Sequence, residues 1–302
     1  MTNPGADNQV ALLEAFKQHL LAEDTSQNTV NAYVSDLSQF MNWYIQTFDA
    51  FDVDEVTPTD IRDYRAFLQE QIPPAAPATI NRRLASLRHF FTWAKGQHLT
   101  VTQPMERIRN VESTVQGPKS LDRKQWNRLQ RCIEQAKGPQ GVRDRCIVLV
   151  LYHTGLRAGE LAALCVHDLT LGERSGHVQV RRGKGNKARS VPLNADVRAA
   201  LRDYLQVRPS CQEPRLFLGQ RGEPLSAHAI YDVVVKYGRL AGLKEVTPHT
   251  LRHTFARTLI VAGIPLNDVA DLLGHSRLDT TRIYTRASGV DLAAAVARLE
   301  TI

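Results

Sequence analysis

Apolar residues recur every three or four positions through most of the first hundred residues, which is the spacing of one buried face of an α-helix. Two such runs fall within residues 10–48 and are separated by a short polar stretch. A third run begins at residues 57–60 with a helix-start signal and ends at the proline pair 73–74. A fourth covers residues 79–95. The pattern predicts a domain of four or five helices over about residues 8–108.

The fourth run has two faces of different character. Thr79 is a suitable N-terminal cap for it. The apolar face consists of Ile80, Leu84, Leu87 and Phe91. The opposite face carries Arg82, Ser86 and His89. We expect that polar face to point toward a bound anion, and Arg82, Arg83 and Arg88 are the candidate contacts.

Residues 110–119 lack apolar periodicity and contain a Gly-Pro pair, so we interpret them as a linker between a domain at residues 1–109 and a second at 120–302. Helical spacing returns over residues 122–136, 140–153, 195–206, 226–241, 248–262, 265–273 and 280–287. Two alternating segments, His177 to Arg181 and Arg189 to Leu193, flank a turn rich in glycine and lysine. The predicted fold class is therefore mostly α with a small antiparallel β-sheet.

Positive charge is concentrated in the second domain. Residues 1–110 hold 9 Lys and Arg against 13 Asp and Glu, whereas residues 111–302 hold 29 against 18. A basic surface speeds the approach of phosphate-rich polymers, and with a sequence pI near 9.4 a polyanion is the first partner to consider. A solvated basic surface without a partner is the alternative that composition leaves open.

Hydrophobicity argues against a membrane protein. The longest uninterrupted apolar stretch runs from Cys146 to Tyr152, whereas a membrane-spanning helix needs roughly 20 such residues. No basic cluster precedes an apolar run near the start of the chain, so no secretory signal is visible. We expect a cytoplasmic protein with no membrane contact.

Two predicted helix starts carry basic residues that are candidates for chemistry. Thr247 and the proline after it open a helix on which His249 and Arg252 share one face within a single turn. The predicted core side of that helix consists of Leu251, Phe255, Thr258 and Ala262. Arg157 stands at another helix start, and Glu160, three positions on, is suited to hold its guanidinium in place. Taken singly, each of these residues has an alternative interpretation as a surface or core-edge residue without a function.

As a set, these motifs resemble those of the tyrosine recombinase (phage integrase) family, and most closely its Xer-like branch. The resemblance covers nearly the whole chain. Its matching segments are TGLRAGEL with Arg157, RRGKGNKARSVPL with Lys184, HTLRHTFA with His249 and Arg252, LLGH with His275, and RIYTR with Tyr284. The resemblance implies an N-terminal helical core-binding domain of the SAM-like type and a C-terminal catalytic domain with an exchanged tail.

The resemblance also implies an activity, namely site-specific recombination of double-stranded DNA through a 3′-phosphotyrosyl intermediate and a Holliday junction. Strand exchange between two duplexes implies a tetramer on DNA, formed by this chain alone or with a sister recombinase. Chromosome or plasmid dimer resolution and mobile-element integration or excision remain equally open. The implied catalytic residues are Arg157, Lys184, His249, Arg252, His275 and Tyr284.

The chemistry explains why these residue types are needed together. The two arginines suit the charge that gathers on the non-bridging oxygens of a five-coordinate phosphorus. A phenol is mostly protonated at neutral pH, so Tyr284 needs an acceptor, for which His249 is the best candidate. Lys184 would protonate the departing 5′ oxygen, and Lys187 is a weaker rival for that role and a candidate DNA contact. His275 would donate a hydrogen bond to the phosphate.

We expect the reaction to need neither a metal nor a cofactor. No group of three or more carboxylates is placed to bind paired Mg²⁺ ions. The glycine-lysine turn also lacks the spacing of an ATP-binding P-loop.

Two other interpretations compete. A transcription regulator or silent DNA-binding scaffold could share the helical first domain and the helix-turn-helix pattern near residues 250–273. A type IB topoisomerase would share the chemistry but act alone and without site preference. Formation of a covalent protein–DNA adduct tests the first alternative, and relaxation of random supercoiled DNA tests the second.

Overall fold

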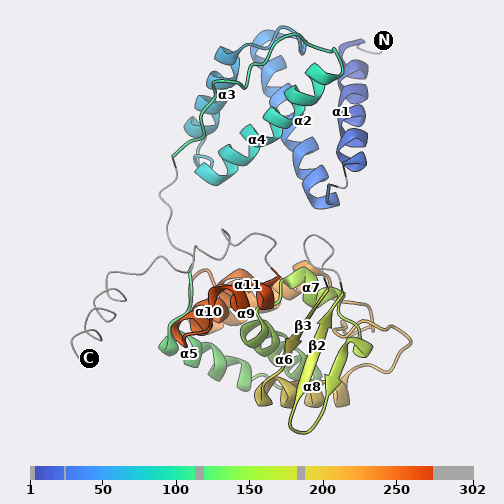
Figure 1. Ribbon diagram of the computed structural model, residues 1–302, viewed down its shortest axis with the longest axis vertical. Helices are drawn as coiled ribbons and strands as arrows, with labels where there is room; N and C mark the ends of the chain where they lie inside the picture. Colours follow the sequence, from blue (N-terminus) through green and yellow to red (C-terminus); the bar gives the residue numbers. More distant parts are fainter. Residues whose placement is uncertain (1–3, 24, 113–118, 182–187, 275–302) are drawn as a thin grey trace, which may run out of the picture. The chain divides into compact units, whose positions relative to one another are not determined.

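The computed structural model describes residues 4–23, 25–112, 119–181 and 188–274. The chain divides into two compact units, residues 1–115 and 116–302. Helices predominate in both units, and the described part of the second contains a three-stranded antiparallel sheet (Figure 1). The predicted fold class is confirmed. Among the described residues, no helix has the length and apolar character needed to cross a membrane.

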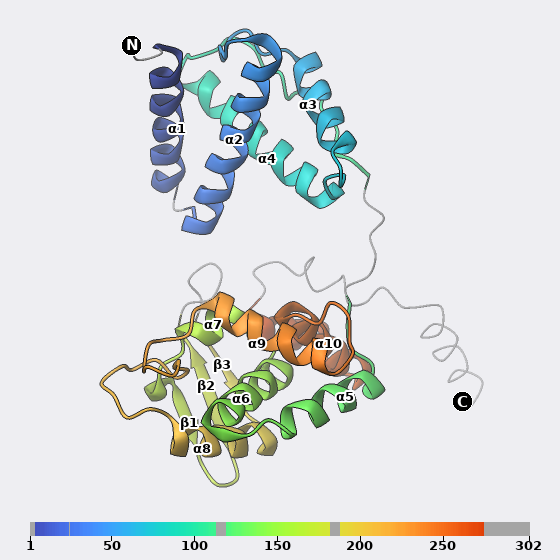
Figure 2. The same ribbon diagram turned by 180° about the vertical axis from the view of Figure 1, so that it is seen from behind.

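The described part of the first unit is built around one central helix. Its helices are α1 (Pro4–Ala22), α2 (Gln27–Phe48), α3 (Pro58–Glu70) and α4 (Pro77–Gly96). Helix α2 packs against each of the other three, and both views place it beside α4 (Figures 1 and 2). The core contains the fully buried rings of Phe16, Phe40, Tyr64, Phe90 and Phe91. The helical spacing at the start of the chain therefore reflects a real aromatic core.

The start of α4 differs from the prediction. The helix begins at Pro77, two residues before Thr79, and its preceding residue, Ala76, provides no side-chain cap. Proline is favoured at the first helical position because its ring fixes φ and because it has no N–H to leave unsatisfied. The prediction that Thr79 caps this helix was wrong for that reason.

The predicted polar face of α4 was also partly wrong. Ser86 is fully buried, and its hydroxyl donates to the buried Asp36 carboxylate of α2 at 2.7 Å. Arg82 forms an ion pair with the same carboxylate. A serine can be buried when its hydrogen bond is satisfied, and the partner that satisfies it lies on another helix.

The second unit surrounds one apolar helix. Its helices are α5 (Arg123–Glu134), α6 (Gly138–Thr154), α7 (Ala158–Ala163), the 3-10 turn η1 (Val166–Asp168), α8 (Ala195–Val207), α9 (Ala227–Leu240), α10 (Pro248–Val261) and α11 (Leu266–Leu273). Helix α6 contacts α5, α8, α9 and α10, and its residues 146–151 are all buried (Figure 2). A helical segment that is apolar on every side belongs in a core. The predicted segment 280–287 lies outside the described residues.

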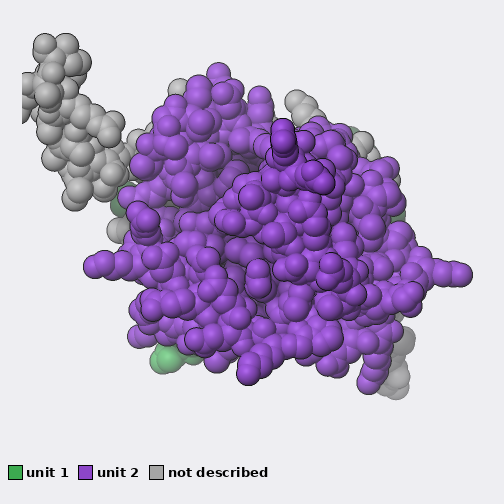
Figure 3. Space-filling view, turned by 90° about the horizontal axis from the view of Figure 1, so that it is seen from below, with its two compact units in different colours: residues 1–115 green, residues 116–302 purple. Residues whose placement is uncertain are grey.

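The sheet has the order β1-β2-β3, with β1 (Leu169–Leu171), β2 (Gly176–Val180) and β3 (Arg189–Pro192). Val178 of β2 lies opposite Leu169 on one side and Val191 on the other. The two predicted strands match β2 and β3, whereas β1 is too short to show alternation. The predicted turn at residues 183–187 lies outside the described residues. One face of this unit, drawn as space-filling in Figure 3, is covered by side chains with shallow hollows between them.

Candidate active site

Arg157 is fixed by the start of α7. It is the N-cap residue of this helix, and its backbone N–H donates to Oε2 of Glu160 at 2.9 Å. Its Nη1 donates to Oε1 of the same carboxylate at 2.7 Å. The contact expected between these two residues is therefore present. The Arg157 side chain is 27% exposed and that of Glu160 only 6%. The buried carboxylate therefore fixes a guanidinium that is partly accessible from the surface.

Arg189, at the start of β3, joins Arg157 and Glu160 in the site, although the sequence did not single it out. Its two terminal nitrogens donate to the two carboxylate oxygens of Glu160 at 3.0 and 2.7 Å, and its Nε donates to the Leu272 carbonyl at 2.9 Å. A signal for it was available. Strand alternation places Arg189 on the same face as Val191, toward the core, where a guanidinium needs a carboxylate partner.

Glu160 is thus shared by two arginines. Burial alone would raise the pKa of its carboxyl group, but hydrogen bonds from Arg189 and from the Arg157 backbone, with both guanidinium charges, hold that pKa below its ordinary value. The carboxylate stays ionised at neutral pH. It can therefore orient Arg157 without being protonated itself.

Arg252 is buried, with 3% of its surface exposed, and it is held by main-chain carbonyls. Its Nη1 donates to the Gly155 carbonyl at 2.6 Å and its Nη2 to the Leu273 carbonyl at 2.8 Å. Gly155 is the C-cap of α6 and Leu273 is the last residue of α11. Carbonyls at helix C-termini carry partial negative charge, so they suit a buried guanidinium.

The predicted faces of α10 need correction. Leu251 is buried as expected, but Thr258 and Ala262 are exposed, whereas Arg252 and Ala256 are buried. Helix α10 packs against both α6 and α11. Two of its sides are therefore covered in its first half, and a single core side does not describe it.

Arg157, His249 and Arg252 line one pocket of about 320 Å³, together with Ala158, Ala227, His228, Tyr231 and Pro248. Burial, reinforced by the positive charges of Arg252 and Arg157, lowers the pKa of His249. The imidazole is therefore neutral at neutral pH and able to accept a proton. The same causes act on the neighbouring His253, where burial and then the charges of His249 and Arg252 lower the pKa to about 4. Two guanidinium groups and a neutral imidazole around one pocket can receive a phosphate and deprotonate an attacking hydroxyl.

The other predicted members of the site, Lys184, Lys187, His275 and Tyr284, lie outside the described residues. Their roles therefore stay predictions. Of the six implied catalytic residues, the structure brings three together.

The predicted anion contacts of the first unit all have partners within that unit. Arg82 pairs with Asp36, Arg83 donates to the Tyr64 hydroxyl at 3.4 Å, and Arg88 donates to the Ile108 carbonyl at 3.1 Å. The Arg82 side chain is 45% exposed and that of Arg83 is 17% exposed. Their role as anion contacts stays a prediction.

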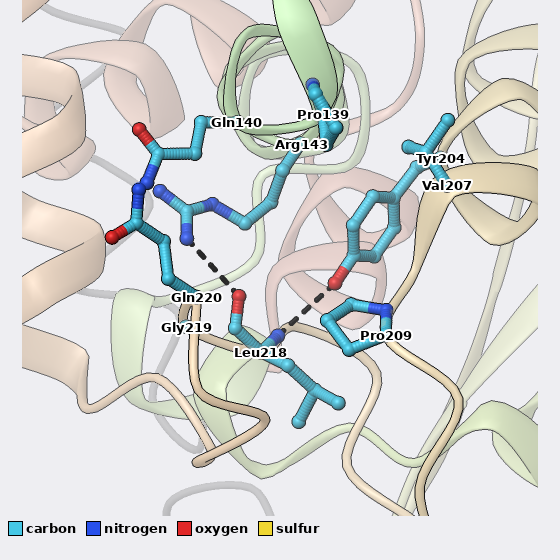
Figure 4. A pocket seen from close by; sticks show the side chains of 9 residues that line it. All are labelled: Pro139, Gln140, Arg143, Tyr204, Val207, Pro209, Leu218, Gly219 and Gln220. Atoms are coloured by element: carbon cyan, nitrogen blue, oxygen red, sulfur yellow. Dashed lines mark hydrogen bonds between the residues drawn. The ribbon is translucent and has the colours of Figure 1, made fainter.

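A different pocket of the second unit contains none of these groups. It has a volume of about 360 Å³ and its lining includes Arg143 and Tyr204 (Figure 4). Arg143 donates to the Leu218 carbonyl at 3.1 Å, and the Tyr204 hydroxyl accepts from the Leu218 N–H at 3.0 Å. Both polar groups bind the main chain of Leu218, and none of the three described catalytic candidates, Arg157, His249 and Arg252, lines this pocket. We therefore place the chemistry at the Arg157 pocket.

Gly155 is expected to be intolerant of a side chain. Its φ is +64°, and a Cβ there would lie 2.4 Å from Cδ1 of Phe255 and 2.9 Å from Cδ2 of Leu273. We expect Gly155→Ala to lower the free energy of unfolding by about 1–3 kcal/mol, measured by chemical denaturation. Gly159→Ala is the control, because a Cβ there meets nothing within 4 Å in a helix. Equal stability of the two variants would contradict this account of the α6 terminus.

Comparisons with known proteins identify the family of this chain. Residues 119–289 match the phage integrase family, and residues 13–98 match the phage integrase N-terminal SAM-like domain. The tyrosine recombinase XerC of Herpetosiphon aurantiacus is 35% identical over 91% of this chain and 90% of its own. The tyrosine recombinase XerA of Pyrococcus furiosus is 34% identical over 95% of this chain and 93% of its own.

A solved structure shares the fold. The crystal structure of the XerH site-specific recombinase bound to a palindromic difH substrate superposes with a TM-score of 0.76 at 24% identity. The alignment covers 95% of this chain and 84% of the XerH chain. With its catalytic unit matched and its relatives at this identity over nine-tenths of its length, the chain belongs to the phage integrase family of tyrosine recombinases, enzymes that cut and rejoin DNA through a tyrosine.

Proposed function

We propose that this protein is an Xer-like site-specific recombinase that exchanges DNA strands through a 3′-phosphotyrosyl intermediate and a Holliday junction. The observation that carries this proposal is the pocket where Arg157, Arg252 and a neutral His249 meet. Tyr284 is the nucleophile, and the reaction uses no metal or cofactor. The protein acts in the cytoplasm on double-stranded DNA.

The two arginines bind the scissile phosphate. Arg252 is fixed by two helix-terminal carbonyls, and Arg157 is fixed by Glu160. Both guanidinium groups are therefore ordered before DNA arrives, which reduces the reorganisation needed in the transition state. Arg189 also fixes Glu160, because it donates a hydrogen bond to each of its carboxylate oxygens.

Proton transfer is divided between two groups. The neutral His249 accepts the proton of the Tyr284 hydroxyl as the phenolate oxygen attacks phosphorus. Lys184 donates a proton to the departing 5′ oxygen, and His275 donates a hydrogen bond to a non-bridging oxygen. The new phosphotyrosyl ester keeps the bond energy of the broken linkage, so a 5′ hydroxyl from the partner duplex reverses the attack.

Each unit has its own task in this proposal. Residues 1–109 bind the core of the recombination site, with Arg82, Arg83, Arg88 and, from the second unit, Lys187 as DNA contacts. Residues 110–119 link them to the catalytic domain at 120–302. Four protomers, identical or paired with a sister recombinase, assemble on two duplexes by exchanging the C-terminal tail.

The lowered pKa of His249 predicts how the rate of covalent adduct formation depends on pH on the acidic side. The ordinary pKa of a histidine is 6.5, and burial with two positive neighbours keeps His249 neutral below that value. The rate of covalent adduct formation should therefore stay level as the pH falls to 6.5 and decline only below it. Single-turnover cleavage measured across this range checks the prediction. In the His249→Ala variant the rate should be lower at every pH and should no longer decline below pH 6.5. A wild-type decline centred above pH 6.5 would contradict the assignment of His249 as the proton acceptor.

The proposal is tested by mapping covalent protein–DNA adducts on genomic DNA after denaturing purification. We expect adducts at one or a few sequences, each with protein on a 3′ end. Absence of adducts would favour a DNA-binding scaffold. Scattered adducts, with relaxation of any supercoiled plasmid, would indicate a type IB topoisomerase instead.

A further inference from the structure

Three metal-ligating side chains converge on the surface of the first unit. His19 lies in the last turn of α1, Glu23 follows that helix, and His89 lies in α4. His19 Nε2 is 3.4 Å from Oε1 of Glu23, and His89 Nε2 is 3.0 Å from Oε2. One ligand atom from each residue lies within 4.8 Å of the other two. We propose that this His19–Glu23–His89 cluster binds one divalent transition-metal ion, with zinc as the preferred ion.

The ligand set suits zinc. Two neutral imidazoles and one carboxylate supply nitrogen and oxygen donors, with bonds of about 2.0–2.2 Å, and leave a fourth position for water. Tetrahedral geometry with those bonds places the donor atoms about 3.4 Å apart, so the cluster closes with shifts on the order of 1 Å. Without an ion, each imidazole can donate to its own oxygen of Glu23. On binding, the nitrogen lone pairs turn to the metal and the protons move to the other ring nitrogens.

Aromatic neighbours hold both imidazoles near this geometry. The His19 ring stacks on Trp93 with centroids 6.0 Å apart and an interplanar angle of 25°. The His89 ring lies 6.0 Å from that of Phe16 and 5.8 Å from that of Tyr33. These contacts restrict ring rotation before the ion arrives, which lowers the entropic cost of binding.

The cluster is also accessible. The three side chains are 31%, 44% and 37% exposed and line a pocket of about 470 Å³. Arg88 is the one arginine of that lining, and its Nη2 donates to the Ile108 carbonyl at 3.1 Å. Among the described residues, the ion-pair partners of Glu23 are His19 and His89.

A second cluster in the described residues, Cys165, His167 and Asp168, is less suited. Oδ1 of Asp168 pairs with Arg181, and its Oδ2 accepts the Cys165 N–H at 2.9 Å. Both carboxylate oxygens are thus already used. This cluster supplies a comparison for the experiment, because it contains a thiol and the first does not.

The test is a titration of the chelator-stripped, full-length protein with cobalt(II), followed by displacement with zinc. We expect one equivalent of cobalt with a tetrahedral absorption spectrum, no thiolate charge-transfer band, and displacement by one equivalent of zinc. His89→Ala and Glu23→Gln should each weaken binding at least tenfold. Glu23→Gln keeps the side-chain shape, and circular dichroism verifies that both variants fold.

Two controls separate a built site from incidental binding. His228 and Asp232 form a similar helical pair at 3.6 Å but have no third ligand among the described residues, so His228→Ala should bind cobalt like the wild type. His167→Ala should also leave the affinity unchanged. The proposal would be overturned if His89→Ala and Glu23→Gln both kept the wild-type affinity for cobalt, or if a thiolate band appeared. An equal loss of affinity in either control variant would also overturn it. Because the measured quantity is metal binding, its outcome is independent of recombination.

Discussion

Replacement of Tyr284 by phenylalanine is expected to reduce the covalent DNA adduct below detection while leaving complex formation intact. The change removes only the hydroxyl oxygen that attacks phosphorus, so the two phosphate-binding arginines, Arg157 and Arg252, and the DNA-binding surface keep their residues. The measurement uses a nicked suicide substrate built on the mapped site, which traps the adduct because the cleaved strand diffuses away. A mobility-shift assay on the same DNA reports binding.

The pocket itself supplies the matched control. Tyr231 lines the same pocket as Arg157 and Arg252, so it is the rival nucleophile within the described residues. Tyr231→Phe should retain adduct formation. If the adduct survives in Tyr284→Phe and is lost in Tyr231→Phe, the nucleophile is Tyr231 and the assignment made from the RIYTR motif is wrong.

Arg252→Lys should lower the rate of adduct formation by about 10²–10³-fold, because loss of one preorganised donor to the developing charge has an effect of that size. Lysine keeps the positive charge but lacks the planar fork that reaches the Gly155 and Leu273 carbonyls together. Leaving those buried acceptors unsatisfied should also lower the free energy of unfolding by about 1–3 kcal/mol. Single-turnover cleavage and chemical denaturation measure the two effects.

Arg257 provides the comparison on the same helix. It is exposed, and its Nη1 donates to the Ser120 hydroxyl at 3.2 Å. Arg257→Lys should change both quantities little. If Arg252→Lys retains the wild-type rate, Arg252 does not bind the phosphate in the transition state, and Arg157 is the one arginine of the pair that does.

Local patterns predicted the parts of this molecule that depend on neighbours in sequence. The apolar spacing of residues 140–153 predicted a helix, and α6 covers that range. Arg157 and Glu160 are three positions apart at a helix start, so their contact could be expected from spacing alone.

Contacts between distant segments were not predicted, and the reason is physical. Arg189 and Glu160 are 29 positions apart, Ser86 and Asp36 are 50 apart, and Arg252 and Gly155 are 97 apart. Helix and strand periodicities describe which way a side chain points relative to its own element. They do not predict which polar group of another element lies next to that side chain. Ser86 was therefore expected on the surface, and Arg189 was overlooked.

The support of Arg252 has a consequence for natural variation. Its two acceptors at residues 155 and 273 belong to the main chain, so exchanging a side chain does not delete either oxygen. The Glu160 carboxylate, in contrast, can be removed by one codon change, and Arg157 and Arg189 would then lose their shared acidic partner. A random mutagenesis screen for inactive alleles should therefore recover Glu160 and Arg252 themselves, whereas no substitution at residue 155 or 273 can remove the carbonyl oxygens that hold Arg252.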